Sequence, residues 1–405
     1  MTATGQAGIA FGREEPADPS LSIVIPCLNE ADTLGGCIDA AIEGMKSAGI
    51  NGEVLVVDNG SIDGSQEIAR TRGARVVNEV KKGYGSALRR GCDEARGCYI
   101  LMGDADASYD FTQIGSFIKG LRAGADLVMG TRIKGAILPG AMPWKNRYIG
   151  NPVSTGLLNR LFRADISDVH CGMRAFTKEA YRSLDLRASG MEFASEMVIR
   201  AAMSGLTIAE VPITFHPDGR DRPPHLRPWR DGWRHLKTIL LFSPTALFLV
   251  PGLALLGIGL LLMCAQLVAP LGEPLEFFGF RMDFHWAILG SLLALVGYQI
   301  VLVNFMAKVY AVNQRRGHED KLLRRALQIL TLERALLAGF VLTAVGVVVD
   351  GIVAWRWLRT DFGPLVTGYS RLFIFGSTLI ALGVQTMFNA FFFSILRDDY
   401  GRDRQ

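Results

Sequence analysis

The chain has 405 residues, of which 49% are hydrophobic and only 20% are charged, and its formal net charge is +4 at pH 7. This length leaves room for two domains. An apolar share this high is difficult to keep dissolved in water and indicates a protein associated with a membrane. The small net charge gives no reason to expect a nucleic acid as a partner.

Cysteine usage and the first residues point to the cytosol. The six cysteines include no CxxC pair, and we expect them to be reduced thiols. Residues 1–20 hold mostly small and charged side chains, without an apolar stretch that could act as the core of a signal peptide. We therefore predict a disordered segment over residues 1–20.

From Leu21 onward, short β-branched segments alternate with helical patterns. The predicted strands are residues 21–26, 53–58, 74–78 and 99–104, and the predicted helices are residues 31–48, 65–72 and 84–95. This alternation is typical of an α/β domain with a mostly parallel sheet flanked by helices. We place the domain at residues 21–217 and expect its ligands beyond the carboxyl ends of the strands.

Four long apolar segments follow, at about residues 243–268, 286–308, 333–356 and 372–396. Each reaches the ~20 residues that cross a bilayer as a helix. Buried core helices are the alternative, but four of them in so short a region leave too little polar surface to cover them. We therefore predict an all-α domain of four transmembrane helices over residues 238–397, followed by a tail at 398–405.

Basic residues concentrate in two of the segments that flank these spans. Lys308, Arg315, Arg316, Lys321, Arg324 and Arg325 lie between the second and third spans, and Arg397, Arg402 and Arg404 follow the fourth. The positive-inside rule places these segments in the cytosol. We therefore expect a multi-pass protein of the cell inner or plasma membrane, with the α/β domain and both termini cytosolic.

Residues 218–237 form a basic juxtamembrane segment, in which Trp229 and Trp233 lie one helical turn apart. An amphipathic segment of this composition is expected in the headgroup layer. Two interpretations stay open: a general anchor to anionic lipid, or a part of the binding site for a lipid substrate.

Asp104 and Asp106 directly follow a hydrophobic strand, with one residue between them. Two carboxylates at this spacing can hold a hard divalent cation that also binds a diphosphate. Taken alone, a solvated acidic loop explains the pair equally well. The first and second strands also end in polar loops, which contain Glu30 and Asp58. Three acidic loops at neighbouring strand ends predict one shared pocket.

Six motifs occur in an order that resembles family 2 glycosyltransferases. They are residues 25–30 (IPCLNE), 56–63 (VVDNGSID), 82–87 (KGYGSA), 104–106 (DAD), 130–132 (GTR) and 168–174 (DVHCGMR). The resemblance is greatest to the polyprenyl-phosphate (dolichol-phosphate) mannose and glucose synthases, and it covers residues 21–217. It implies a GT-A nucleotide-sugar-binding fold for this domain.

The same resemblance implies roles for individual residues. The nucleotide-binding positions would be Pro26, Leu28, Asn29, Glu30, Asp58, Asn59, Lys82, Gly83, Asp104 and Ala105. The acceptor phosphate would contact Arg132, Arg147, Asn151 and Arg174, although surface charge beside a membrane is another explanation for the arginines. A divalent metal, Mg²⁺ or Mn²⁺, would bind Asp106 and Ser108, where the family often has Gln at the second position. The catalytic set would be Asp104, Asp106, Asp168 and Arg132, with Asp168 near the sugar or the diphosphate.

These roles imply an inverting transfer of a hexose from a nucleotide sugar, of the UDP-glucose or GDP-mannose class, to a polyprenyl or dolichyl phosphate. A phosphate monoester is largely an oxyanion at neutral pH, so it needs orientation by arginines more than deprotonation by a strong base. The reaction would take place at the cytosolic face of the lipid bilayer. Association into a homo-oligomer is left open.

Two other functions compete with this interpretation. A processive membrane polysaccharide synthase shares the fold, but the Gln-x-x-Arg-Trp motif of those enzymes is missing, and the nearest segment is residues 227–230 (RPWR). A non-catalytic, transferase-like membrane scaffold would not need the intact pair Asp104 and Asp106. A dinucleotide-binding enzyme, suggested by Gly83 and Gly85, is excluded because the third glycine of that motif is missing.

Overall fold

The structure of the protein is a computed structural model that describes residues 19–220, 228–268, 275–277, 280–313, 321–329 and 331–402. Most of the predicted disordered segment 1–20, residues 221–227 of the juxtamembrane segment and the last three residues of the predicted tail lie outside this range. The chain divides into two compact units, Met1–Ile239 and Leu240–Gln405. Each unit is described by itself below.

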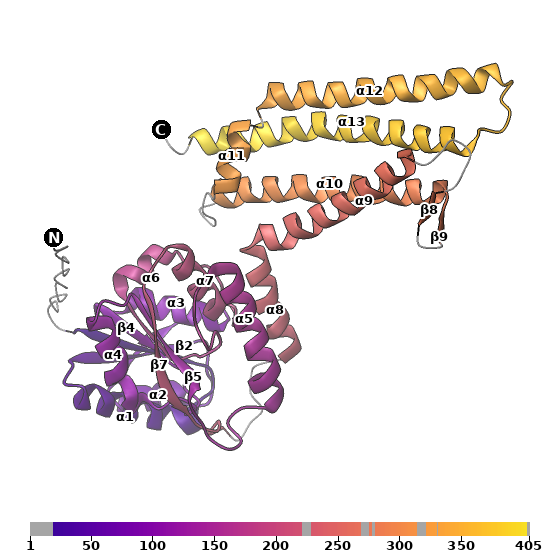
Figure 1. The fold of residues 1–405 in the computed structure, drawn as a ribbon. Coiled ribbons are helices and arrows are strands. Elements are labelled where there is room, and N and C mark those ends of the chain that lie inside the picture. The colour runs from indigo at the N-terminus through magenta and orange to yellow at the C-terminus, as the bar shows by residue number, and fades with distance from the viewer. Residues whose placement is uncertain are drawn as a thin grey trace, which may run out of the picture. The chain divides into compact units, whose positions relative to one another are not determined.

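The first unit is built on a seven-stranded sheet (Figure 1). Its strands are β1 (Leu21–Cys27), β2 (Gly52–Asp58), β3 (Arg75–Asn78), β4 (Tyr99–Met102), β5 (Leu127–Ile137), β6 (Arg174–Thr177) and β7 (Ile208–Phe215). They lie in the order β3-β2-β1-β4-β6-β5-β7, and only β6 is antiparallel to its neighbours. The mostly parallel sheet predicted from the sequence is confirmed.

Helices cover both faces of this sheet (Figure 1). They are α1 (Ala31–Ser47), α2 (Ser65–Thr71), α3 (Tyr84–Glu94), α4 (Ile114–Arg122), α5 (Asn151–Phe162), α6 (Lys178–Leu184), α7 (Phe193–Met203) and α8 (Pro228–Leu241), with the short turns η1 (Phe111–Gln113) and η2 (Asn146–Gly150). Ile23 of β1 packs in one core with residues of α1 and α4. Val24 faces the other side, against Gly91 of α3, where an added Cβ would clash. Burial on both faces explains why the strand is apolar throughout.

The carboxyl ends of β1, β2 and β4 meet at one edge of the sheet, because the three strands are parallel and in register. The backbone N–H of Asn59 donates to the carbonyl of Cys27 at 2.9 Å, which ties the loop after β2 to the end of β1. Gly103, just after β4, donates to the carbonyl of Val24 at 3.3 Å. The loops that follow these strands are therefore neighbours, as the predicted pocket requires.

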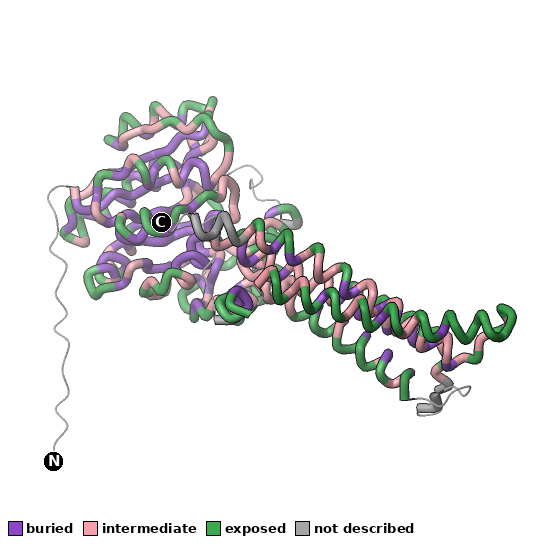
Figure 2. Tube along the Cα trace, turned by 90° about the horizontal axis from the view of Figure 1, so that it is seen from above, coloured by how far each residue is buried: buried purple, intermediate pink, exposed green. Residues whose placement is uncertain are grey.

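The described part of the second unit contains four helices long and apolar enough to cross a membrane, over Thr245–Val268, Phe284–Val312, Leu332–Arg359 and Thr367–Leu396. The elements are η3 (Thr245–Leu249), α9 (Val250–Val268), β8 (Leu275–Phe277), β9 (Phe280–Met282), α10 (Phe284–Asn313), α11 (Lys321–Ile329), α12 (Leu332–Arg359) and α13 (Thr367–Arg402). Large apolar side chains such as Leu261 and Phe388 are more than 70% exposed. Figure 2 shows this contrast between the exposed long helices and the buried strands of the first unit. Helix α13 continues to Arg402, into the stretch predicted to be a tail.

Small residues bring these helices together in pairs. Gly259 of α9 lies against the backbone of Gly290 on α10, and Gly339 of α12 lies against the backbone of Gly383 on α13. Such contacts let apolar helices approach closely without a hydrophobic driving force. Within α12, the carboxylate of Asp350 accepts a hydrogen bond from Ser377 of α13 at 2.8 Å.

Hydroxyl pairs join the two helix pairs. Ser291 of α10 lies 2.7 Å from Thr378 of α13, and Tyr298 of α10 lies 2.6 Å from Thr386 of α13, measured between the side-chain oxygens. These polar contacts satisfy groups that lipid could not. The second unit is thus a specific bundle with α10 and α13 along its centre.

Candidate active site

Asp58, at the end of β2, organises its own loop. The residue is 2% exposed, and its carboxylate accepts hydrogen bonds from the backbone N–H groups of Gly60 (3.0 Å) and Ser61 (3.1 Å) and from the side chain of Gln66 (2.8 Å). The resemblance implies a nucleotide contact for Asp58. These bonds hold Asp58 in its loop, and its contact with the nucleotide stays a prediction.

Asn59 and Lys82, also predicted to bind the nucleotide, tie two loops together. The Asn59 side chain donates to the carbonyls of Glu79 (2.8 Å) and Lys81 (3.0 Å) and accepts from the N–H of Gly83 (2.8 Å). The ammonium of Lys82 donates to the Asn59 carbonyl at 2.5 Å. These contacts hold the loop before α3 beside the end of β2, so Gly83 and Lys82 border the predicted pocket.

The loop after β1 is joined to the loop after β2 in the same way. The backbone N–H of Asn29 donates to Ser61 Oγ at 2.8 Å, and Asn29 Oδ1 accepts from the N–H of Ile62 at 2.9 Å. The N–H of Glu30 donates to Ser65 Oγ at 3.0 Å. Pro26, near the end of β1, and Leu28, at the start of the loop, are half-buried. The structure thus brings the predicted nucleotide-binding loops together.

Asp104 and Asp106 follow β4 and are held by different elements. Asp104 Oδ1 accepts a hydrogen bond from the hydroxyl of Tyr84, on α3, at 2.7 Å. Between the two acids, the carbonyl of Ala105 accepts from Thr33 of α1 at 2.6 Å. Burial and the negative charge of Asp106 raise the pKa of Asp104 to about 7. Two carboxylates this strongly coupled form a site that a cation would stabilise.

Ser108, predicted to be a metal ligand, positions Asp106 in this structure. Its backbone N–H and its hydroxyl both donate to Asp106 Oδ1, at 3.0 and 2.5 Å. The second oxygen of Asp106 faces Arg220, whose Nη2 lies 2.8 Å away. Arg220 also donates to Glu30 Oε1 at 3.0 Å and is paired with Asp218. A guanidinium therefore supplies the positive charge next to the carboxylate pair.

The residues around Asp106 fit a divalent cation only in part. Among the described residues, no three His, Cys, Asp or Glu side chains are grouped as ligands for a metal ion. Asp104 and Asp106 are hard oxygen donors, and their mutual repulsion favours a cation. Mg²⁺ and Mn²⁺ commonly take few protein carboxylates and complete their shell with phosphate oxygens and water. Asp104 and Asp106 are thus suited to hold a metal together with a diphosphate.

Arg132 and Asp168 form a buried ion pair. Nε and Nη2 of Arg132 donate to the two oxygens of Asp168 at 2.7 and 2.8 Å, and the backbone N–H of Arg132 adds a third bond at 3.1 Å. Asp168 is fully buried, and burial by itself would raise the pKa of this carboxyl. The hydrogen bonds and charge of Arg132 outweigh this effect and hold the pKa below its usual value. The guanidinium also lies over the ring of Phe215, 5.0 Å from its centre.

Gly172 connects this ion pair to the acidic pair. A Cβ at this position would lie 2.7 Å from Asp104 Oδ2, so the segment of residues 168–174 passes directly beside the carboxylate. The N–H of Gly172 donates to the hydroxyl of Tyr109 at 2.7 Å. The positive charge of Arg132 acts on Asp104 and opposes part of the rise in the pKa of this carboxyl. The predicted catalytic residues Asp104, Asp106, Asp168 and Arg132 therefore belong to one electrostatic network.

Arg174, one of the predicted phosphate-binding residues, has partners inside the fold. It is fully buried and donates to the carbonyls of Cys171, Val169 and Ala194 at 2.6 to 2.9 Å. These bonds give Arg174 a structural role. Its contact with the acceptor stays a prediction.

Asn151 and Arg147 lie in different environments. Asn151 is 3% exposed and donates to Asp168 Oδ1 at 2.8 Å, so it supports the buried ion pair. Arg147 is exposed, and its guanidinium lies 5.4 Å from the ring centre of Tyr148. The phosphate contacts expected of these two residues and of Arg132 stay predictions.

Arg220 and Tyr84 are functional candidates that the sequence analysis missed. Residue 220 falls in the segment assigned to lipid headgroups, and no spacing rule links it to residue 106. Tyr84 follows the Gly83 turn as an ordinary helix residue, and only the fold shows that its hydroxyl reaches Asp104.

The mostly parallel sheet, with acidic loops at the carboxyl ends of its strands, has the architecture of the GT-A class of glycosyltransferases, and comparison with known proteins agrees. Residues 22–185 match the family described as Glycosyl transferase family 2, and residues 305–397 match the Glycosyltransferase family 2 C-terminal transmembrane region. The chain is 38% identical over 377 residues to the low-salt glycan biosynthesis hexosyltransferase Agl6 of Haloferax volcanii, across 92% of this chain and 88% of Agl6. The protein belongs to glycosyltransferase family 2 and is an integral membrane glycosyltransferase.

Other similarities cover about half of the chain. Glycosyltransferase AglJ of Haloferax volcanii is 35% identical over 221 residues, which are 54% of this chain and 70% of AglJ. A crystal structure of glucosyl-3-phosphoglycerate synthase from Mycobacterium tuberculosis, in complex with Mn²⁺, UDP and glucosyl-3-phosphoglycerate, is 23% identical. Its TM-score is 0.44, and the match covers 55% of this chain and 79% of that one.

Proposed function

We propose that the protein transfers a hexose from a nucleotide sugar, of the UDP-glucose or GDP-mannose class, to a polyprenyl or dolichyl phosphate, with inversion at the anomeric carbon. The observation that carries this proposal is the buried pair Arg132–Asp168 in the same charge network as Asp104 and Asp106. The acidic pair suits a donor diphosphate with its metal, and the arginine suits an anionic acceptor. The membrane unit explains why that acceptor would be a lipid.

In this mechanism the loops after β1 and β2 and the loop before α3 border the nucleotide, and Asp104 faces the ribose and diphosphate. A divalent cation held by Asp104 and Asp106 would neutralise charge on the departing nucleoside diphosphate. Arg220 contacts the Asp106 carboxylate. If the guanidinium moved from this carboxylate to the diphosphate, it would also neutralise charge on the leaving group. The site thus favours the leaving group by electrostatics and needs no acid to protonate it.

Arg132 would orient the acceptor. Its Nε and Nη2 are fixed by Asp168, while Nη1 makes no hydrogen bond with the described residues. A guanidinium held in one orientation can present this remaining edge to a phosphate oxygen. The phosphate oxygen would attack the anomeric carbon, the new C–O bond would form as the bond to the diphosphate breaks, and no proton would have to be removed from the acceptor.

We place this chemistry at the cytosolic face of the membrane. Helix α11 and the connections on both sides of it are rich in basic residues, which supports a cytosolic position for that end of the bundle. In the juxtamembrane segment, α8 presents Trp233 with 61% exposure, as an interfacial anchor would. Our proposal keeps both interpretations of this segment, the anchor and the lipid-binding surface.

The test uses the full-length protein, purified in detergent or in nanodiscs. A panel of UDP- and GDP-sugars is offered with a polyprenyl phosphate and Mg²⁺ or Mn²⁺. We expect one donor to yield a lipid carrying a single sugar through a phosphodiester, with the anomeric configuration of the donor inverted. Asp106→Asn should abolish the product, and Asp39→Asn, which changes an exposed acid on α1, should not.

Other products would contradict the proposal. A growing polymer would support the processive synthase. Transfer to a sugar hydroxyl but never to a lipid phosphate would show that the acceptor is a sugar and not a lipid phosphate. Equal product from wild type and Asp106→Asn would remove the acidic pair from the chemistry.

A further inference from the structure

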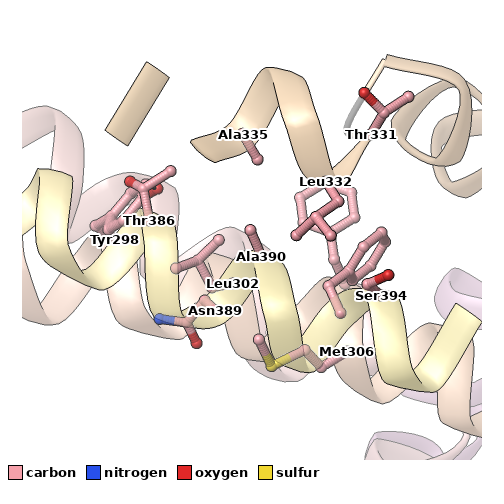
Figure 3. A pocket seen from close by; sticks show the side chains of 12 residues that line it. Tyr298, Leu302, Met306, Thr331, Leu332, Ala335, Thr386, Asn389, Ala390 and Ser394 are labelled. Atoms are coloured by element: carbon pink, nitrogen blue, oxygen red, sulfur yellow. The ribbon is translucent and has the colours of Figure 1, made fainter. Parts of the chain in front are cut away.

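A gap in the second unit, between α10, α13 and the start of α12, is too small for a lipid chain (Figure 3). Its volume is about 70 Å³, whereas ligand sites have volumes of about 300 to 1,000 Å³. The hydroxyls of Tyr298 and Thr386, which line the gap, bond to each other. In the proposed function the acceptor is oriented instead by Arg132 of the first unit, so the residues that hold Arg132 decide how well the acceptor is placed.

Glu210, on β7, has a side chain that is 10% exposed and takes no part in the transfer described above. Its Oε1 accepts hydrogen bonds from the backbone N–H of Ser167 at 2.6 Å and from the Ser167 hydroxyl at 2.9 Å. Its Oε2 accepts from the same hydroxyl at 3.0 Å and from the ammonium of Lys134 at 2.7 Å. Ser167 directly precedes Asp168, so Glu210 holds the residue next to the buried ion pair.

Thr131 precedes Arg132 in the same way. Thr131 is fully buried, and its hydroxyl oxygen lies 2.6 Å from that of Ser167. Each residue of the ion pair Arg132–Asp168 is therefore preceded by a residue of a hydroxyl pair, Thr131–Ser167. The two contacts tie the same two segments of backbone together, so a change in the hydroxyl pair would shift the ion pair as well.

The hydrogen bonds of this hydroxyl pair have one direction. A carboxylate can only accept, so the Ser167 hydroxyl donates its single proton to Glu210. The Ser167 oxygen then accepts from the Thr131 hydroxyl, and the Thr131 oxygen accepts from the backbone N–H of Lys134 at 3.3 Å. Glu210 therefore sets the orientation of both hydroxyls, because it is the acceptor at the end of this series of bonds.

The backbone pairing between β5 and β7 is interrupted at Arg132. The two strands pair in register up to Thr131, which lies opposite Pro212, and the register shifts before pairing resumes at Ala136. Pro212 has no N–H to donate to the neighbouring strand. The side chain of Glu210 replaces part of the missing ladder, because it ties β7 to the hydroxyl pair.

We propose that Glu210 is a positioning residue for the transfer: through the hydroxyl pair it holds the Arg132–Asp168 ion pair in the orientation that meets the acceptor. Glu210 itself contacts neither the sugar nor the phosphate. The proposal rests on the proposed function, because Arg132 is assigned to the acceptor there. A misplacement of about 1 Å in a group that positions a substrate can lower a rate about a hundredfold, so such a role is measurable.

The test compares acceptor use with nucleotide binding in the full-length protein in detergent. Glu210→Met removes both accepting oxygens and keeps an unbranched side chain. We expect kcat/KM for the lipid phosphate to fall about tenfold, while the dissociation constant of the nucleoside diphosphate changes less than about twofold. Glu210→Gln keeps an oxygen that can accept both bonds from Ser167, so it should restore most of the activity.

Lys134→Gln is the matched control for the charge of Glu210. The Lys134 side chain is 59% exposed, and an exposed ion pair contributes little, so kcat/KM and nucleotide affinity should both stay as in the wild type. Thr131→Val removes a hydroxyl at nearly constant volume and should reproduce the loss caused by Glu210→Met. Thr131→Ser keeps the hydroxyl and should not. These two variants carry the test if Glu210→Met does not fold.

A double-mutant cycle shows whether Glu210 acts through Arg132. If it does, Glu210→Met should cost nothing further in Arg132→Lys, so the double variant should have the kcat/KM of Arg132→Lys alone. A role in the stability of the fold alone would instead lower kcat/KM by the same factor in both backgrounds.

Three results would overturn the proposal. They are an equal fall in nucleotide affinity and in kcat/KM, losses that add in the cycle, or full activity of both Glu210→Met and Thr131→Val. If the wild-type protein transfers sugar to no lipid phosphate, the proposed function fails. The same cycle, run with the acceptor that the enzyme does use, then still decides whether Glu210 acts through Arg132.

Discussion

Nη2 of Arg220 lies 2.8 Å from Oδ2 of Asp106, the carboxylate that would hold a divalent metal. The same guanidinium contacts Glu30 and Asp218, so three acids share one cation. A metal at Asp106 would compete with Arg220, because both neutralise the same oxygen. Binding of a metal at this oxygen would require Arg220 to change its partner.

Removing this competitor should strengthen metal binding and weaken catalysis. For Arg220→Ala we expect Mn²⁺ to bind in the absence of nucleotide about tenfold more tightly, equivalent to about 1.4 kcal/mol. We expect kcat to fall, because the departing diphosphate loses a cation. Mn²⁺ affinity is measured by electron paramagnetic resonance, and kcat is measured at saturating metal.

Arg187→Ala is the matched control, since Arg187 Nη2 lies 2.7 Å from Asp185 Oδ2 in an exposed ion pair. It should change neither quantity. Weaker Mn²⁺ binding by Arg220→Ala would show that Arg220 supports the metal instead of competing with it.

Arg132→Lys should separate acceptor use from donor binding. Lysine keeps the charge but loses the planar fork that bonds both oxygens of Asp168. We expect kcat/KM for the lipid phosphate to fall about a hundredfold, because the loss of one oriented hydrogen-bond donor to a transition state has an effect of about this size. The dissociation constant of the nucleoside diphosphate, measured by calorimetry, should change less than threefold.

Arg147→Ala serves as the comparison, because Arg147 is exposed and belongs to no ion pair among the described residues. Its effect on kcat/KM should be small. A loss with Arg147→Ala as large as with Arg132→Lys would restore the acceptor role predicted from the sequence.

Features that depend on neighbouring residues can be predicted from the sequence, whereas contacts between residues far apart in the chain cannot. The strands and helices of residues 21–104 follow from local patterns, and the four apolar helices follow from length and composition, so the structure confirms both. Asp104 and Asp106 are recognisable because only one residue separates them along the chain. The partners of Arg174 are three carbonyls that only the folded chain assembles, and a motif cannot tell such an arginine from one that binds substrate. The Arg220–Asp106 contact joins residues 114 positions apart, which no local pattern encodes.

Arg174 offers a test of that distinction. Arg174→Met keeps an unbranched apolar stem but leaves three buried carbonyls without donors, and each unsatisfied carbonyl costs about 1–3 kcal/mol. We expect less folded protein and a lower thermal midpoint in detergent. The folded fraction should keep normal affinity for the nucleotide. Arg182→Met, at an exposed position of α6, should leave the midpoint unchanged. A variant of normal stability with selective loss of acceptor use would return Arg174 to the active site.

His170, which is half-buried, and His235, which is buried, form a pair that links α8 to the rest of the first unit. Their ring centres are 4.5 Å apart in an edge-to-face arrangement, and His235 Nδ1 lies 2.8 Å from Ser195 Oγ on α7. Burial lowers the pKa of His170 to about 3, and the charges of His235 and Arg132 act in the same direction. Burial also lowers the pKa of His235 to about 4, opposed by Glu192 and Asp231.

Acidification should therefore loosen α8. Between pH 6.5 and about 4 the unfolded chain binds protons at these histidines and the folded chain does not, so the free energy of unfolding falls as the pH falls. The slope approaches about 1.4 kcal/mol per pH unit for each histidine. Hydrogen exchange of the full-length protein, corrected for the intrinsic pH dependence, should show faster exchange in α7 and α8 at pH 5.0 than at pH 7.5. His235→Gln removes one titrating group and should reduce this difference, whereas His216→Gln, outside the pair, should preserve it. Protection of α8 that does not change with pH in the wild-type protein would mean that the pair accepts a proton without opening the helix contact.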